Sequence, residues 1–274
     1  MCFKEKEDES QFLAIINTIG YYKFSQYFRH FYDISGNTKC FKEGTQGRDI
    51  IEAYQRNEEL RQILIVMLLK IESRLKTQLI EVLIQERKDI YWCYHSDYSD
   101  LNLIDKATEK SGKSKSKSEY KAQSTKLFFQ QYPNHTKLPA WVVLQSHEFG
   151  TLCYLMKHSK FSNQALIAIV KKFALPKSFK AYKLIDVFNA LRHLRNLCVH
   201  HEKILGESIR VKPPLWKDLP TNTDSKIDNF IHWITCLLFS MMHKNTYESE
   251  LLSIIEKIQA TCPKSMQILH YPLP

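Results

Sequence analysis

One short stretch of the chain, residues 194–201, concentrates side chains that together can cleave RNA. It reads Leu-Arg-Asn-Leu-Cys-Val-His-His and contains Arg195, Asn196, His200 and His201. Arginine is a permanent cation that can hold phosphate oxygens through two donors at once, and histidine exchanges protons near neutral pH. The combination predicts metal-free cleavage. His200 would transfer a proton at the 2′-hydroxyl or the leaving 5′-oxygen, Arg195 would stabilise charge on phosphorus, and Asn196 would hold a phosphate oxygen or the imidazole ring.

An amphipathic helix predicted over residues 178–200 carries these side chains. Its apolar positions are spaced by three and four residues, as in one buried stripe of an α-helix: Leu184, Val187, Leu191, Leu194 and Cys198. The polar face carries Arg192, His193, Asn196 and His200, with Arg195 at its edge. An arginine and a histidine near a helix C-terminus are also favoured by the helix dipole, so the residue types alone fit a purely structural explanation as well.

A second polar residue, Glu72, lies in an otherwise apolar helix predicted over residues 57–87. A carboxylate in apolar surroundings costs free energy unless it is paired. Because Lys76 follows one turn later, the simplest interpretation of Glu72 is an ion pair within its own helix.

Lysines are concentrated in two segments, and the net charge of +10 favours an anionic partner. Residues 106–126 contain seven lysines and two glutamates, and their Ser/Lys-rich centre, which is typical of a loop, includes Lys113, Lys115 and Lys117. The second cluster leads into the motif helix and consists of Lys171, Lys172, Lys177, Lys180 and Lys183. With Arg192, both clusters are candidates for RNA phosphate contacts, although most lysine runs are simply solvated surface.

The composition indicates a cytoplasmic protein without a cofactor. Seven cysteines are scattered with no Cys-x-x-Cys pair, as expected for reduced thiols. The first residues are charged, unlike a signal peptide, and no apolar run reaches the roughly 20 residues that span a bilayer. We expect no metal site, no membrane association and RNA rather than DNA as the partner.

Four segments of the chain together resemble the Abi-like abortive-infection family, of the AbiD/AbiF type, in the HEPN superfamily of ribonucleases. One is the motif itself, with Arg195 followed by Asn196 and then His200. The others read IGYYKFS at residues 19–25, KIESRLKT within residues 61–80, and LPAWVVL followed by FGTL within residues 138–152. They occur in the family's order over residues 12–212.

The resemblance implies an endoribonuclease toxin of a bacterial phage-defence or toxin–antitoxin system. It would leave a 2′,3′-cyclic phosphate and a 5′-hydroxyl, act as a homodimer in which two motifs form one cleft, and be restrained by a small non-coding antitoxin RNA. Glu72, with Lys76 and His201, would support Arg195 and His200 as neighbours. A non-catalytic RNA-binding protein is the alternative, because some HEPN-type proteins only bind RNA.

Helical periodicity and only seven glycines predict an all-α fold, which the resemblance specifies as a HEPN-like helical bundle with an N-terminal helical extension and helical insertions. The predicted domains are the extension at 1–56, the helical domain at 57–262 with a Lys/Ser-rich insertion near 106–126, and a C-terminal tail at 263–274. In the extension, the aromatic side chains are expected to pack in the core: Tyr21, Tyr22, Phe24, Tyr27 and Phe28. Helices are predicted at 9–18, 22–32, 49–56, 57–87, 101–110, 118–131, 139–158, 163–173, 178–200, 224–243 and 248–261.

Overall fold

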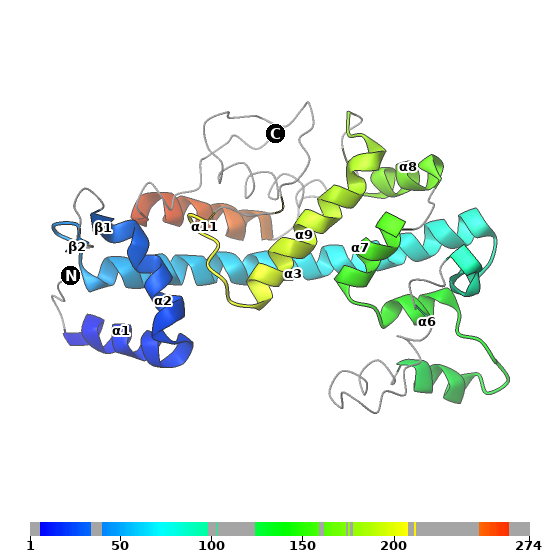
Figure 1. Ribbon diagram of the computed structural model, residues 1–274, viewed down its shortest axis with the longest axis horizontal. Coiled ribbons are helices and arrows are strands. Elements are labelled where there is room, and N and C mark those ends of the chain that lie inside the picture. Colours follow the sequence, from blue (N-terminus) through cyan, green and yellow to red (C-terminus); the bar gives the residue numbers. More distant parts are fainter. Residues whose placement is uncertain are drawn as a thin grey trace. The chain divides into compact units, whose positions relative to one another are not determined.

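The computed structural model describes residues 6–33, 40–97, 103, 124–158, 162–173, 175, 178–207, 211 and 247–262. These residues are predominantly helical, which confirms the all-α class (Figure 1). The strands among them are the two-residue β1 (Tyr32–Asp33) and β2 (Cys40–Phe41), which pair antiparallel. Every helix among the described residues is too short or too polar to cross a membrane.

The longer helices are α1 (Lys6–Ile19), α2 (Tyr21–Phe28), α3 (Gly47–Arg87), α6 (Ala140–Gln145), α7 (Phe149–His158), α8 (Asn163–Lys172), α9 (Leu184–Val199) and α11 (Tyr247–Thr261). Short 3₁₀ turns lie at η1 (Arg29–Phe31), η2 (Trp92–Tyr94) and η4 (Ala181–Lys183). The helix predicted at 139–158 is therefore two helices, and the regular part of the motif helix begins at Leu184. The helices predicted at 101–110 and 224–243 fall outside the described residues, apart from Leu103.

The fold consists of two compact units. The first contains α1, α2, the strand pair, α3 up to Leu68, α9 from His193 with the turn after it, and α11. The second contains the rest of α3, η2, α6, α7, α8, η4 and α9 up to Arg192. The domain division at residues 56 and 262 stays a prediction.

Helix α3 is one continuous element of 41 residues, which corrects the prediction of a break before Asn57. Asn57 does not cap a helix start. Its side chain is fully buried, and its Oδ1 accepts hydrogen bonds from the backbone N–H groups of Ile204 (2.8 Å) and Leu205 (3.1 Å). Because no glycine or proline interrupts residues 48–87, and Asn57 finds its partners in another segment, nothing locally ends the helix.

Aromatic packing joins α1, α2 and α3 in the first unit. The ring of Phe24 lies 4.9 Å from that of Phe12 and 5.7 Å from that of Tyr54, in both cases edge to face. Phe24, Tyr27 and Phe28 are buried as predicted. Tyr21 and Tyr22 are not, since 63% and 81% of their surfaces are exposed, because they lie in the first turn of α2 beyond the packed stripe.

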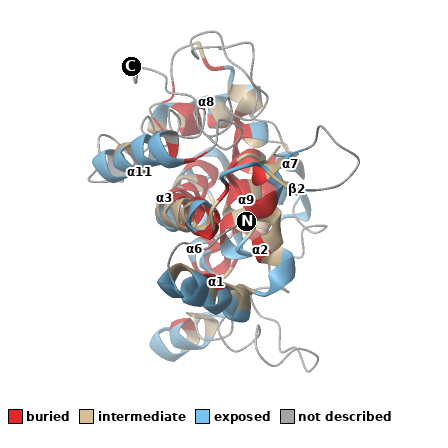
Figure 2. Cartoon of the chain, turned by 90° about the vertical axis from the view of Figure 1, so that its left-hand side faces the viewer, coloured by how far each residue is buried: buried red, intermediate tan, exposed pale blue. Residues whose placement is uncertain are grey.

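In the second unit, rings from three segments form the core. Phe188 of α9 packs edge to face against Phe149 of α7 and Phe173, and the Arg74 guanidinium lies 5.1 Å from the centre of the Phe173 ring. The predicted apolar stripe of α9 is confirmed, because all five of its side chains are buried. The buried faces of the helices appear in red in Figure 2.

Cysteine reactivity tests this packing. Burial raises the pKa values of Cys93, Cys153 and Cys198 to about 12, whereas Cys40 is exposed. The thiolate is the reactive form, so we expect iodoacetamide at pH 8 to label Cys40 at least about tenfold faster than the three buried thiols. Peptide-resolved mass spectrometry measures the rates, and labelling in denaturant provides the control. Fast native labelling of Cys198 would contradict the packing of α9.

Candidate functional site

The predicted motif occupies the last turn of α9 and the residue after it. The Arg195 Nη1 donates to Asn196 Oδ1 over 3.4 Å, and both side chains are partly exposed. His200 follows the helix directly, its N–H bonded to the carbonyl of Asn196 (2.9 Å), and its side chain is exposed. The structure therefore brings Arg195 and Asn196 into contact and places His200 one turn later, in solvent.

The helix ends in a Schellman turn built on a histidine. The His201 N–H bonds to the Cys198 carbonyl (3.4 Å), and the Glu202 N–H bonds to the Leu197 carbonyl (3.0 Å). This pattern needs a left-handed residue, which is usually glycine, yet His201 holds that position with φ of 56°. Such a conformation costs a non-glycine residue about 1–2 kcal/mol. Backbone strain of this kind is often found at functional sites.

Two cations approach the carbonyls at this helix end. The buried Arg61 of α3 donates from Nη1 to the Cys198 carbonyl (2.8 Å), and Lys23 of α2 donates from Nζ to the His200 carbonyl (2.9 Å). Positive charge is favoured there by the helix dipole. The N–H groups of Ile204 and Leu205 also donate to Asn57, so these contacts together fix the turn on both sides of His201.

Arg61 is itself held by a carboxylate of its own helix. Its Nε donates to Glu58 Oε1 (3.1 Å), and its Nη2 contacts Glu58 Oε2. The hydrogen bond to Glu58 raises the pKa of Arg61, and burial opposes it. The pair keeps a charged guanidinium aimed at the end of α9.

A buried lysine holds the chain just after the turn. Only 1% of the Lys203 side chain is exposed, and its ammonium contacts Glu207 (2.9 Å) and His30 and lies 5.7 Å from the centre of the Tyr27 ring. Burial lowers the pKa of Lys203 and, with the nearby ammonium, lowers that of His30 to about 4. His30 is therefore neutral at physiological pH.

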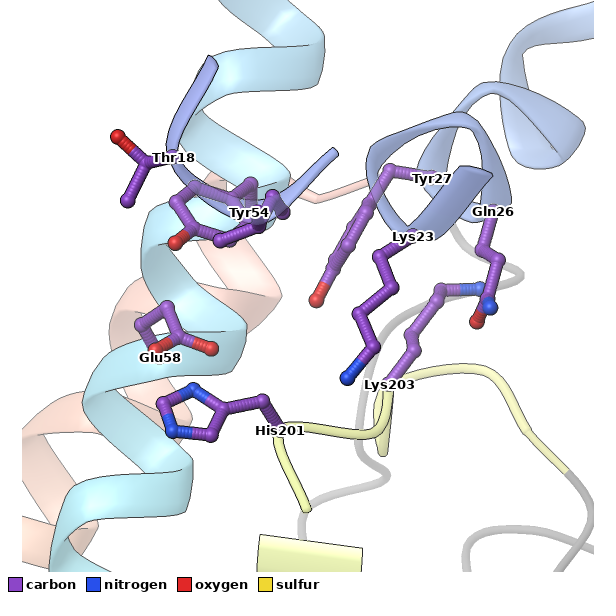
Figure 3. A pocket seen from close by; sticks show the side chains of 9 residues that line it. Thr18, Lys23, Gln26, Tyr27, Tyr54, Glu58, His201 and Lys203 are labelled. Atoms are coloured by element: carbon purple, nitrogen blue, oxygen red, sulfur yellow. The ribbon is translucent and has the colours of Figure 1, made fainter. Parts of the chain in front are cut away.

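A pocket of about 330 Å³ lies beside this turn within the first unit (Figure 3). Four segments supply its labelled side chains: Thr18 from α1; Lys23, Gln26 and Tyr27 from α2; Tyr54 and Glu58 from α3; and His201 and Lys203 after α9. The sticks in Figure 3 place Glu58 and Tyr54 above the His201 ring, with Lys23 and Tyr27 facing them. His201, the residue directly after His200, thus lines this pocket.

The predicted ion pair between Glu72 and Lys76 within α3 is confirmed, since the Lys76 Nζ lies 3.6 Å from the Glu72 Oε1. Both belong to the second unit, as does Arg192, which is partly buried. A supporting role of Glu72 and Lys76 toward the motif stays a prediction.

The described residues of the second lysine cluster also belong to the second unit. Lys171 and Lys180 are exposed and Lys183 is partly so, whereas Lys172 is paired with Glu81 of α3. Lys113, Lys115, Lys117 and Lys177 lie outside the described residues. Within the described part of the chain, no group of three or more His, Cys, Asp or Glu side chains is arranged to hold a metal ion.

The sequence interpretation missed the residues that fix the turn, namely Lys23, Asn57, Arg61 and Lys203. A signal was present for two of them. Asn57 and Arg61 are spaced i, i+4, so they share one face of a helix whose neighbouring positions Leu60 and Leu64 are buried.

A family model described as Abi-like protein covers residues 14–205, which include the motif and all four residues that fix the turn. No curated protein and no solved structure is similar enough to match the chain.

His201 gives a direct test of the turn. Replacing it with glycine removes the left-handed strain, so we expect the free energy of unfolding to rise by about 1 kcal/mol, or at least not to fall. Urea denaturation measures it. The control is Gly206→Ala, which adds a side chain where φ is 70° and should destabilise the fold. Clear destabilisation by His201→Gly would contradict the Schellman turn.

Proposed function

Because this chain belongs to the Abi-like protein family, whose members are associated with abortive infection in phage defence, we propose that it is a metal-independent endoribonuclease of the HEPN type. The observation that supports this most directly is the end of α9, where Arg195 and Asn196 are in contact and His200 is exposed one turn later. Lys23 and Arg61 hold the backbone of that turn, so the side chains that would meet RNA project from a fixed support.

The proposed reaction is transesterification. The 2′-oxygen attacks the neighbouring phosphorus and the bond to the 5′-oxygen breaks, which gives a 2′,3′-cyclic phosphate and a 5′-hydroxyl. His200 removes the 2′-proton or supplies a proton to the leaving oxygen. Arg195 stabilises the negative charge that develops on the phosphoryl oxygens. Asn196 fixes the orientation of the Arg195 guanidinium.

This chemistry needs a base and an acid, and a single His200 supplies one proton transfer at a time. We therefore propose a homodimer in which the motifs of two copies face one phosphate. A structured RNA, such as a small antitoxin RNA, is the proposed restraining partner, and the net charge of +10 supports an RNA partner.

Substitutions at the motif test catalysis. His200→Ala and Arg195→Ala should each lower the rate of RNA cleavage at least about 100-fold and abolish toxicity in cells. Both side chains lie outside the apolar stripe, so the melting temperature should stay near that of the wild type. His135→Ala and Arg48→Ala, at exposed positions, are matched controls.

EDTA should not stop cleavage, because neither proton transfer nor charge stabilisation is assigned to a metal. A fully toxic His200→Ala variant would exclude the nuclease assignment and favour a protein that only binds RNA.

Mass photometry tests the assembly. We expect a species of twice the 32.4 kDa chain mass, either in the free protein or after RNA is added, because the composite site needs two motifs. The control is the same measurement at several protein concentrations. The share of a reversible dimer rises with concentration, whereas a species that does not associate keeps one mass. A strict monomer that nevertheless cuts RNA would contradict the two-motif mechanism.

A further inference from the structure

The pocket beside His201 is connected to the proposed cleavage motif in two ways. His201, which lines it, is the next residue after His200, and Lys23, another lining residue, donates to the His200 carbonyl. Neighbouring Cα atoms are about 3.8 Å apart, so an RNA strand with a phosphate at His200 would lie within reach of the pocket, and one of its bases could enter there.

The lining suits a flat group that also forms hydrogen bonds. The half-buried ring of Tyr54 offers aromatic surface of the kind on which unpaired bases stack. The almost fully buried ring of Tyr27 packs edge to face against it, with centres 5.6 Å apart and planes at 85°. The Gln26 amide and the tyrosine hydroxyls add neutral donors and acceptors. The volume of about 330 Å³ lies at the small end of ligand pockets, roughly 300–1,000 Å³.

The charges in the pocket are mixed. Glu58 lines it with a carboxylate that is paired with Arg61. The ammonium of Lys203 is paired with Glu207 and is almost fully buried. The Lys23 ammonium donates to the His200 carbonyl, which is neutral, so Lys23 keeps its positive charge.

Glu58 suits a group that donates hydrogen bonds. An ionised carboxylate only accepts, and its two oxygens together have about four lone-pair positions. Arg61 uses one position on each oxygen, which leaves positions for a donor from the pocket. Carboxylates accept in this way from the exocyclic amino group of cytosine, whereas the corresponding position of a uracil-type base is an acceptor oxygen.

From this geometry we infer that the pocket binds one unpaired nucleobase of the RNA strand, next to the cut phosphate, and that Glu58 selects bases with an exocyclic amino group over uracil. The inference rests on the proposed function, because the strand in the pocket is the one cut at His200. It adds a base preference at one position to a reaction that would otherwise ignore sequence.

Binding to a variant that cannot cut tests the pocket independently of catalysis. With full-length His200→Ala protein, isothermal titration calorimetry should give a Kd of about 1 mM or tighter for CMP, and at least about fivefold weaker binding for UMP. The nucleoside cytidine should compete with CMP, whereas inorganic phosphate should not. Equal binding of CMP and UMP, or displacement by phosphate but not by cytidine, would overturn the inference.

Two variants assign the preference to the pocket. Glu58→Gln, made in the His200→Ala background, adds donors and removes charge, so the difference between CMP and UMP should shrink to about twofold or less. Glu59→Gln is the matched control, since Glu59 forms the same kind of pair with Arg56 on the same helix but does not line the pocket. If Glu58→Gln fails to fold, Thr18→Phe replaces it, because Thr18 is exposed at the pocket edge and a ring there should block CMP binding without disturbing the core. Unchanged binding in the folded variants would contradict the pocket assignment.

Cleavage by the wild-type chain separates this inference from the proposed function. Sequencing of the cut ends should show uracil depleted at one position beside the cut, and Thr18→Phe, which blocks the pocket in an otherwise wild-type chain, should remove this depletion. Cleavage with no base preference, together with no CMP binding, would leave the nuclease standing and remove the base pocket. Selective CMP binding without any cleavage would keep the pocket and remove the nuclease.

Discussion

The end of helix α9 is the constraint around which the first unit is organised. The last carbonyls of a helix have no partners within it, and here three carbonyls at the end of α9 accept from the following turn or from other helices. The Leu197 carbonyl takes the N–H of Glu202, the Cys198 carbonyl takes that of His201 and the Arg61 guanidinium, and the His200 carbonyl takes Lys23. Helices α2 and α3 must therefore lie where their cations reach these oxygens, and the aromatic packing of Phe24 between Phe12 and Tyr54 holds them there.

Buried charge makes this arrangement specific. Arg61 with Glu58, and Lys203 with Glu207 and His30, lie on either side of the turn. Such pairs add little net stability, but removing one partner leaves a charge buried without compensation. An alternative packing of α3 against the turn would take the Arg61 guanidinium away from the Cys198 carbonyl, and a shift of the turn would take Lys203 away from His30. These contacts thus restrict the turn to one geometry more than they strengthen the fold.

Periodic patterns in the sequence were enough to find the motif helix and its buried stripe, because the stripe from Leu184 to Cys198 depends only on neighbours three and four residues apart. Contacts between distant segments left no such pattern. Asn57 resembles a helix cap by its type, yet it accepts from Ile204 and Leu205, and α3 continues through it. Tyr22 belongs to an aromatic cluster in the sequence but lies on the exposed side of a short helix. The left-handed conformation of His201 was hidden because glycine, its usual sign, is missing from the turn.

The contacts at the end of α9 also determine when the site can exist during synthesis. Lys23 and His200 are 177 residues apart, and Asn57 meets residues 147 and 148 positions later. The N-terminal segments of a chain leave the ribosome and begin to fold first, so α1, α2 and the first turns of α3 emerge with no partner for Lys23, Asn57 or Arg61. The turn that carries His200 is fixed only after residue 205 has left the exit tunnel. A nascent chain therefore lacks this fixed turn until the segment that follows α9 has emerged.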